Sequence, residues 1–109
     1  MRNEFSSAYA QVDALISPTT PTTAFKVGEK ASDPLAMYYS DVCTVASNLS
    51  GDPAMSVPIG TDEGGLPIGF QVMAPALGEE MMFRVAAEVE RLADFSATPE
   101  LASSEVVAP

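Results

Sequence analysis

The stretch SVPIGTDEGGLPIGFQVMAP, residues 56–75, holds two short apolar runs on either side of a Gly-Gly pair. Gly64 and Gly65 can adopt positive φ, so these residues predict a β-hairpin with a turn of several residues. Apolar residues alternate along both runs, as is typical of strands with one buried face. Pro58 and Pro67 lack an amide donor and are expected at strand ends, edges or bulges.

Three helices are predicted around this hairpin from apolar residues at helical spacing. The second has the clearest boundaries, because Ser32 or Asp33 can cap it, Pro34 suits its first turn and Gly51 stands beyond its end. The predicted spans are 3–12, about 35–50 and 79–93.

Between the first two helices, the run ALIS, residues 14–17, predicts a short strand closed by Pro18. A connection of roughly 18 residues, SPTTPTTAFKVGEKASDP, follows and is too rich in proline for regular structure. Residues 1–95 are therefore assigned to one α/β unit. Residues 96–109, rich in Ser, Ala, Pro and Glu, are predicted to be a disordered tail.

The composition excludes several functional classes. Fifteen acidic against five basic residues give a net charge of −10, which disfavours direct contact with nucleic acid. The sequence contains no apolar run long enough for a transmembrane helix, and its first residues do not form a signal peptide, so a cytoplasmic chain is predicted. A single cysteine, Cys43, cannot form an internal disulfide.

The residues also offer little catalytic chemistry. The absence of histidine excludes Ser-His-Asp and Cys-His mechanisms and histidine metal sites. Cys43 is interpreted as a buried structural thiol, and Asp62 with Glu63 as solvated turn residues rather than metal ligands. Asp41 falls at the border of the apolar face of the second helix, where a carboxylate is ordinarily solvated or a cap partner.

Residues 3–93 resemble the carboxy-terminal part of the amidase-signature family. The segments SVPIG and GLPIGFQ are shared across amidases generally. The segments PTTPTTAFKVGEK and DPLAMYYSD are most similar to the branch formed by the A subunits of glutamyl/aspartyl-tRNA amidotransferases, which release ammonia from glutamine.

The resemblance implies a piece of an α/β/α domain with a mixed sheet. It also implies that the Ser-Ser-Lys triad and the glycine-rich oxyanion hole of the family lie upstream of the matching residues, so no catalytic residue and no metal ligand is assigned and the chain alone is expected to be inactive. One binding residue carries over: Asp41 would receive the α-ammonium of glutamine. The implied partners are the B and C subunits, with tRNA reached only through the complex and ATP and magnesium used by the B subunit.

The sequence also departs from the family. Ala46 and Ser47 stand where a proline is common, and Asp52 stands where an apolar residue usually precedes Pro53. Two alternatives remain open at this point: a fragment of a general amidase, and a noncatalytic binding module whose apolar face is covered by a partner.

Overall fold

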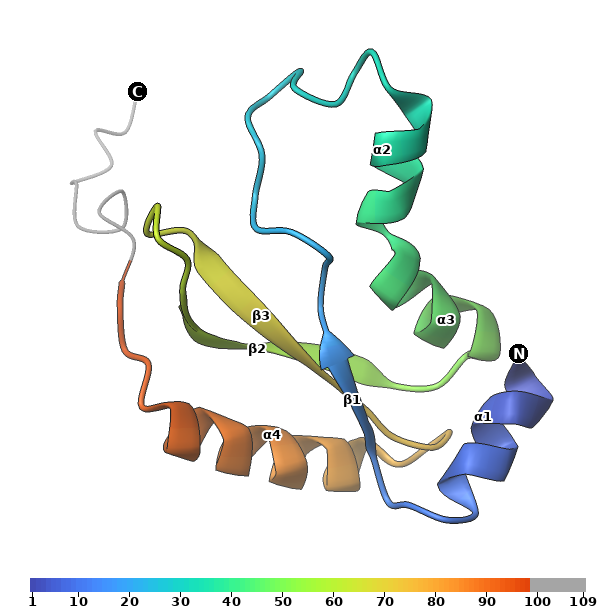
Figure 1. Ribbon diagram of the computed structural model, residues 1–109. Coiled ribbons are helices and arrows are strands. Elements are labelled where there is room, and N and C mark those ends of the chain that lie inside the picture. The colour runs from blue at the N-terminus through green and yellow to red at the C-terminus, as the bar shows by residue number, and fades with distance from the viewer. Residues whose placement is uncertain (99–109) are drawn as a thin grey trace, which may run out of the picture.

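The computed structural model describes residues 1–98 as an α/β structure (Figure 1). The elements are α1 (Arg2–Tyr9), β1 (Leu15–Pro18), α2 (Pro34–Ser40), α3 (Val42–Ser50), β2 (Ala54–Thr61), β3 (Pro67–Met73) and α4 (Glu79–Ala93). The predicted fold class is confirmed. Of the tail predicted at 96–109, residues 96–98 lie in no helix or strand and residues 99–109 lie outside the described residues.

The hairpin strands β2 and β3 join β1 in a three-stranded sheet with the order β1-β3-β2, in which β3 is central and both pairs are antiparallel. Thr19 N donates to Gly69 O, and Ala74 N donates to Pro53 O. Because backbone groups alternate in direction along a strand, Pro18 and Pro58 face the outer edges of the sheet, where a missing N–H costs no pairing with β3. A bulge between Pro58 and Gly60 then shifts the register of β2.

One face of the sheet is apolar and is covered by α4, which lies along it in Figure 1. The alternating apolar residues predicted for the hairpin point to this side. Glu79 and Glu80 lie in the first turn of α4 and Arg91 in the last, as its macrodipole favours. The buried core consists of Val57, Val72, Ala74, Met82 and Ala86.

The prediction of one helix over 35–50 is wrong, because Asp41 separates α2 from α3 with φ −101° and ψ 1°. Both predicted ends are correct: the Asp33 carboxylate accepts from two amides of the first turn, and Gly51 has φ 81°. Just before the break, Ser40 Oγ donates to Ala36 O, and this kind of hydroxyl bond to the preceding turn bends helices.

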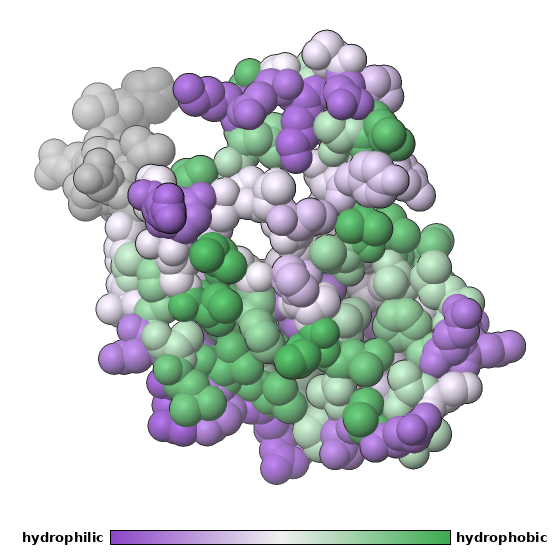
Figure 2. Space-filling view, viewed as in Figure 1, coloured by the Kyte–Doolittle hydropathy of each residue, from purple (hydrophilic) through white to green (hydrophobic). Residues whose placement is uncertain are grey.

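Many large apolar side chains outside the core are exposed. On α2 and α3 they include Leu35, Tyr38 and Leu49, each more than 60% exposed. Figure 2 shows a second hydrophobic area over β1 and the neighbouring sheet. It includes an apolar groove of about 330 Å³ lined mainly by Ile16, Pro18, Ile59, Ile68 and Phe70. Within residues 1–98, the helices are too short or too polar to cross a membrane.

Candidate functional site

Asp41, the predicted substrate-binding residue, lies exposed at the junction of α2 and α3. Its backbone carbonyl accepts from Thr44 N and Val45 N and so begins α3. Its carboxylate makes no capping bond to α3 and no ion pair with another described residue. A free carboxylate at a helix junction is available to a cationic group.

The long connection between β1 and α2 returns to this junction through Lys30. Lys30 Nζ donates to Ser40 Oγ at 3.0 Å and lies 4.1 Å from the ring centroid of Phe25. A Ser–Lys pair suggests nucleophilic chemistry, but Ser40 Oγ already donates to Ala36 O. The contact therefore attaches the connection to α2 next to Asp41.

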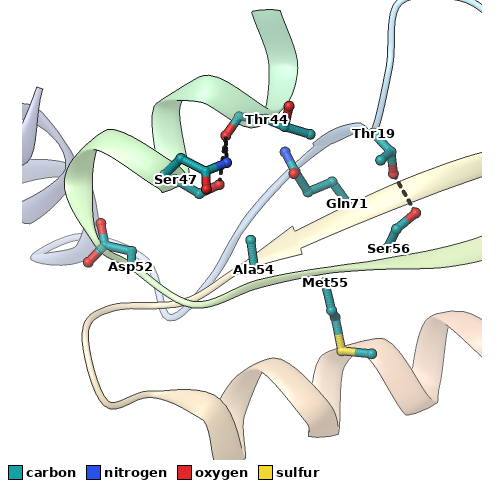
Figure 3. Close-up of a pocket in the computed structure, with 9 residues that line it drawn as sticks. Thr19, Thr44, Ser47, Asp52, Ala54, Met55, Ser56 and Gln71 are labelled. Carbon is teal, nitrogen blue, oxygen red and sulfur yellow. Dashed lines mark hydrogen bonds between the residues drawn. The ribbon is translucent and has the colours of Figure 1, made fainter. Parts of the chain in front are cut away.

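On the sheet face opposite α4, a polar cleft of about 390 Å³ lies between α3 and the strands (Figure 3). Its walls come from the end of β1, from α3 and the residues after it, and from the hairpin. The lining residues are Thr19, Thr44, Ser47, Asn48, Asp52, Ala54, Met55, Ser56 and Gln71. Asp41 does not line the cleft, but Thr44 and Asn48 follow it at i+3 and i+7, on the same side of the helix.

Gln71, like Ser47, is a buried polar residue of this cleft, and it is 3% exposed. Its Nε2 donates to Cys43 O and to Ser17 Oγ, both at 2.9 Å. The Cys43 carbonyl can only accept, so it fixes which end of the carboxamide faces α3. Gln71 Oε1 accepts no hydrogen bond from any residue within 1–98.

Two hydroxyls close the cleft near the end of β1. Thr19 Oγ1 and Ser56 Oγ share a hydrogen bond of 2.6 Å across the central strand. The bond passes over Gly69, where a Cβ would lie 2.6 Å from Ser56 Oγ and 2.7 Å from Thr19 Oγ1. Glycine at this position therefore permits the two outer strands to be joined above β3.

Asp52 is half-buried between the cleft and α1. Figure 3 shows it at the end of the cleft distant from Gln71. Burial, and secondarily the negative charge of Asp52, raise the pKa of Tyr9, whose buried hydroxyl has no hydrogen-bond partner among the described residues. On the same side, Arg2 Nε donates to Ser50 O at the end of α3.

Asp62 and Cys43, which were also considered from the sequence, have structural roles in the fold. The Asp62 carboxylate accepts from Thr23 Oγ1 at 2.6 Å and from two amides of the hairpin turn, and these bonds, that of Thr23 foremost, lower the pKa of Asp62. Cys43 is half-buried rather than buried. Residues 1–98 contain no group of three or more Cys, Asp or Glu side chains placed to hold a metal.

Sequence reasoning missed the polar cleft. Its signal is a cross-strand row, because Ser17 and Ser56 both pair in register with Gln71. Each of these residues alternates with apolar neighbours, so the pattern that predicts the apolar face also identifies the polar one. The crossing of α3 over this row depends on tertiary contacts, and the local sequence does not predict it.

Comparisons with known proteins agree with one another. The Amidase family profile matches residues 1–83. The chain is 53% identical over 97 residues to the A subunit of glutamyl-tRNA(Gln) amidotransferase from Maricaulis maris, covering 89% of this chain and 20% of that protein. It therefore spans about a fifth of the length of such curated relatives.

Solved structures show the same relationship. The crystal structure of the A subunit of glutamyl-tRNA(Gln) amidotransferase from Thermotoga maritima matches with a TM-score of 0.78 at 41% identity, over 83% of this chain and 20% of that one. A 6-aminohexanoate cyclic dimer hydrolase matches with a TM-score of 0.74 at 30% identity, over 93% of this chain and 23% of that one.

Proposed function

The chain belongs to the amidase family, and from this premise we propose that it forms the carboxy-terminal part of the A subunit of a tRNA-dependent amidotransferase. In this role it supplies one wall of the glutamine pocket and no reacting group. The whole enzyme hydrolyses glutamine and passes ammonia to a mischarged tRNA in the cytoplasm. The B and C subunits complete the complex, and the B subunit uses ATP and magnesium.

The observation that carries the proposal is the free carboxylate of Asp41 at the junction of α2 and α3. An unpaired carboxylate there can accept charge-assisted hydrogen bonds from the α-ammonium of glutamine. The attachment of the preceding loop through Lys30 and Ser40 supports a defined position for this junction.

The test is a chimera in which this chain replaces the 97 matching residues of the Maricaulis maris A subunit, produced with the B and C subunits of that organism. Asp41→Asn is expected to raise the KM for glutamine about 10- to 100-fold, as for loss of a charged hydrogen bond, with a smaller change in kcat. Hydrolysis of an amide without an α-amino group should change much less. Asp13→Asn, an exposed carboxylate outside this junction, is the matched control.

Equal losses on glutamine and on the simple amide would reject the role of Asp41. A general amidase is the second candidate, favoured by the similar TM-score of the 6-aminohexanoate cyclic dimer hydrolase and its larger coverage of this chain. A chimera that hydrolyses simple amides well and glutamine poorly would favour that candidate.

A further inference from the structure

Lys30 directs its ammonium group at a neutral side chain. It lies half-buried in the connection between β1 and α2, and its Nζ donates to Ser40 Oγ at 3.0 Å. The chain has fifteen acidic residues against five basic ones, yet Lys30 forms no ion pair with a carboxylate of residues 1–98. Because partial burial of an ammonium costs solvation free energy, its remaining contacts must offset that cost. The role of Lys30 therefore lies in its contact with Ser40.

This contact fixes the direction in which the Ser40 hydroxyl donates. An ammonium can only donate, so Ser40 Oγ accepts from Lys30 and its single proton must point elsewhere. That proton goes to Ala36 O at 3.0 Å, in the preceding turn of α2. Without Lys30 the hydroxyl is free to rotate and to donate to solvent. Lys30 thus holds the hydroxyl in the orientation that bends a helix.

Asp41 follows Ser40 directly, so the orientation of this hydroxyl bears on the Asp41 carboxylate. At Asp41 the backbone passes from α2 into α3, and the two helices meet at an angle (Figure 1). The amide of Asp41 donates to Tyr38 O, and its carbonyl accepts from Thr44 N and Val45 N as α3 begins. The direction of the Asp41 side chain therefore depends on the bend between the two helices.

The connection presents Lys30 from a defined turn. Gly28 has φ 83°, and its carbonyl accepts from Ala31 N at 3.1 Å. Lys30 Nζ also lies 4.1 Å from the ring centroid of Phe25, and this cation–π contact limits the directions that the ammonium can take. The ammonium thus reaches Ser40 from a position that the turn and the aromatic ring determine.

We propose that Lys30 is a positioning residue for Asp41: it holds the Ser40 hydroxyl toward Ala36 O, sets the bend between α2 and α3, and so aims the Asp41 carboxylate at the ammonium group of the substrate. This inference rests on the proposed function, because it takes that carboxylate to bind glutamine. Lys30 acts through Ser40 and not on the reacting amide. Its loss should therefore weaken binding of glutamine and leave the chemical step nearly unchanged.

The first test uses the covalent chimera with the Maricaulis maris A subunit, produced with the B and C subunits. Lys30→Met keeps an unbranched side chain and removes the ammonium. It should raise the KM for glutamine about 3- to 10-fold, as for loss of one hydrogen bond, with kcat changed less than about twofold. Lys30→Arg should restore the KM, because a guanidinium can still donate to Ser40 Oγ and lie against Phe25. Lys26→Met removes the same charge from an exposed position of the same connection and should leave the KM unchanged.

Ser40→Ala tests whether Lys30 acts through the hydroxyl. It should raise the KM by a similar factor, and Lys30→Met combined with Ser40→Ala should be no worse than either single variant, because the same bond is lost in all three. Hydrolysis of an amide without an α-amino group should change much less in each variant. Additive losses in the combined variant would overturn the proposed route through Ser40.

A second measurement does not depend on glutamine. In the ¹⁵N-labelled 109-residue chain, Lys30→Met should shift the backbone amide signal of Asp41, whereas Lys26→Met should not. An unmoved Asp41 signal would overturn the proposal, as would an unchanged KM for Lys30→Met in a chimera whose Asp41→Asn variant binds glutamine poorly. If Asp41→Asn lowers hydrolysis of glutamine and of the simple amide equally, the proposed function fails, and the Asp41 signal still reports whether Lys30 sets this junction.

Discussion

The two faces of the sheet differ in how completely this chain covers them. On one face, α4 packs against alternating apolar residues and buries Val57 and Val72. On the other face, α3 crosses a polar row centred on Gln71 and leaves a cleft of about 390 Å³. The same strands thus carry an apolar surface on one side, which α4 covers in part and which leaves the groove beside Ile16 and Phe70 open, and a hydrogen-bonding surface on the other. The two sides therefore offer surfaces of opposite polarity.

The largest effect is expected where the apolar face is broken beneath α4. Val72→Asp buries an unpaired charge at a position with no solvent exposure, and should lower the free energy of unfolding by about 3–5 kcal/mol. Ile16→Asp is the matched control, because Ile16 pairs with Val72 on the same face but is 61% exposed. It should cost about 0.5 kcal/mol. Urea unfolding followed by circular dichroism measures both, and similar losses would show that α4 does not shield Val72 from solvent.

A smaller effect is expected from crowding the polar face. Gly69→Ala brings a Cβ into the Thr19–Ser56 hydrogen bond and should cost about 1–3 kcal/mol by overpacking. Gly64→Ala in the hairpin turn, where the nearest atom would be Asp62 Oδ1 at 3.3 Å, is the control and should cost less than about 0.5 kcal/mol. If the two variants were equally stable, the hydroxyl bridge would not be a fixed part of this face.

The smallest effect concerns the far end of the hairpin, where Asp62 joins the turn to the Pro/Thr-rich connection. Its folded-state pKa is lowered, first by Thr23, so its contribution to stability is present above its unfolded pKa of about 3.9 and is lost as the pH falls through the folded pKa. The urea midpoint of the wild-type chain should therefore fall more than that of Asp62→Asn when the pH is lowered below about 4. Parallel pH profiles for the two proteins would contradict the assignment.

Much of the fold was predictable because its signals are local. The cap at Asp33, the left-handed Gly51 and the full span of α4, residues 79–93, follow from propensity, capping and helical spacing. The hairpin follows from alternation and from Gly65, whose φ is 82°. These features depend on residues close together in the chain.

What the sequence did not reveal depends on contacts between distant residues. The break at Asp41 accompanies a bond from Lys30 to Ser40, which requires the long connection to fold back on α2. The cleft depends on the position of α3 over the sheet, where Gln71 Nε2 donates to the carbonyl of Cys43. These two residues are 28 positions apart in the chain. The side chain of Asp41 was predicted to bind substrate, and this stays a prediction that the chimera tests.

The two edge prolines have a consequence for self-association. A foreign strand that pairs along β2 meets Pro58, which offers no N–H, and then the bulge before Gly60. Along β1, Pro18 ends the strand two residues after Ile16. Intermolecular strand pairing along either edge is thus terminated after a few backbone hydrogen bonds. The chain leaves much apolar surface uncovered, but because of these prolines it is a poor template for fibril growth through its sheet edges.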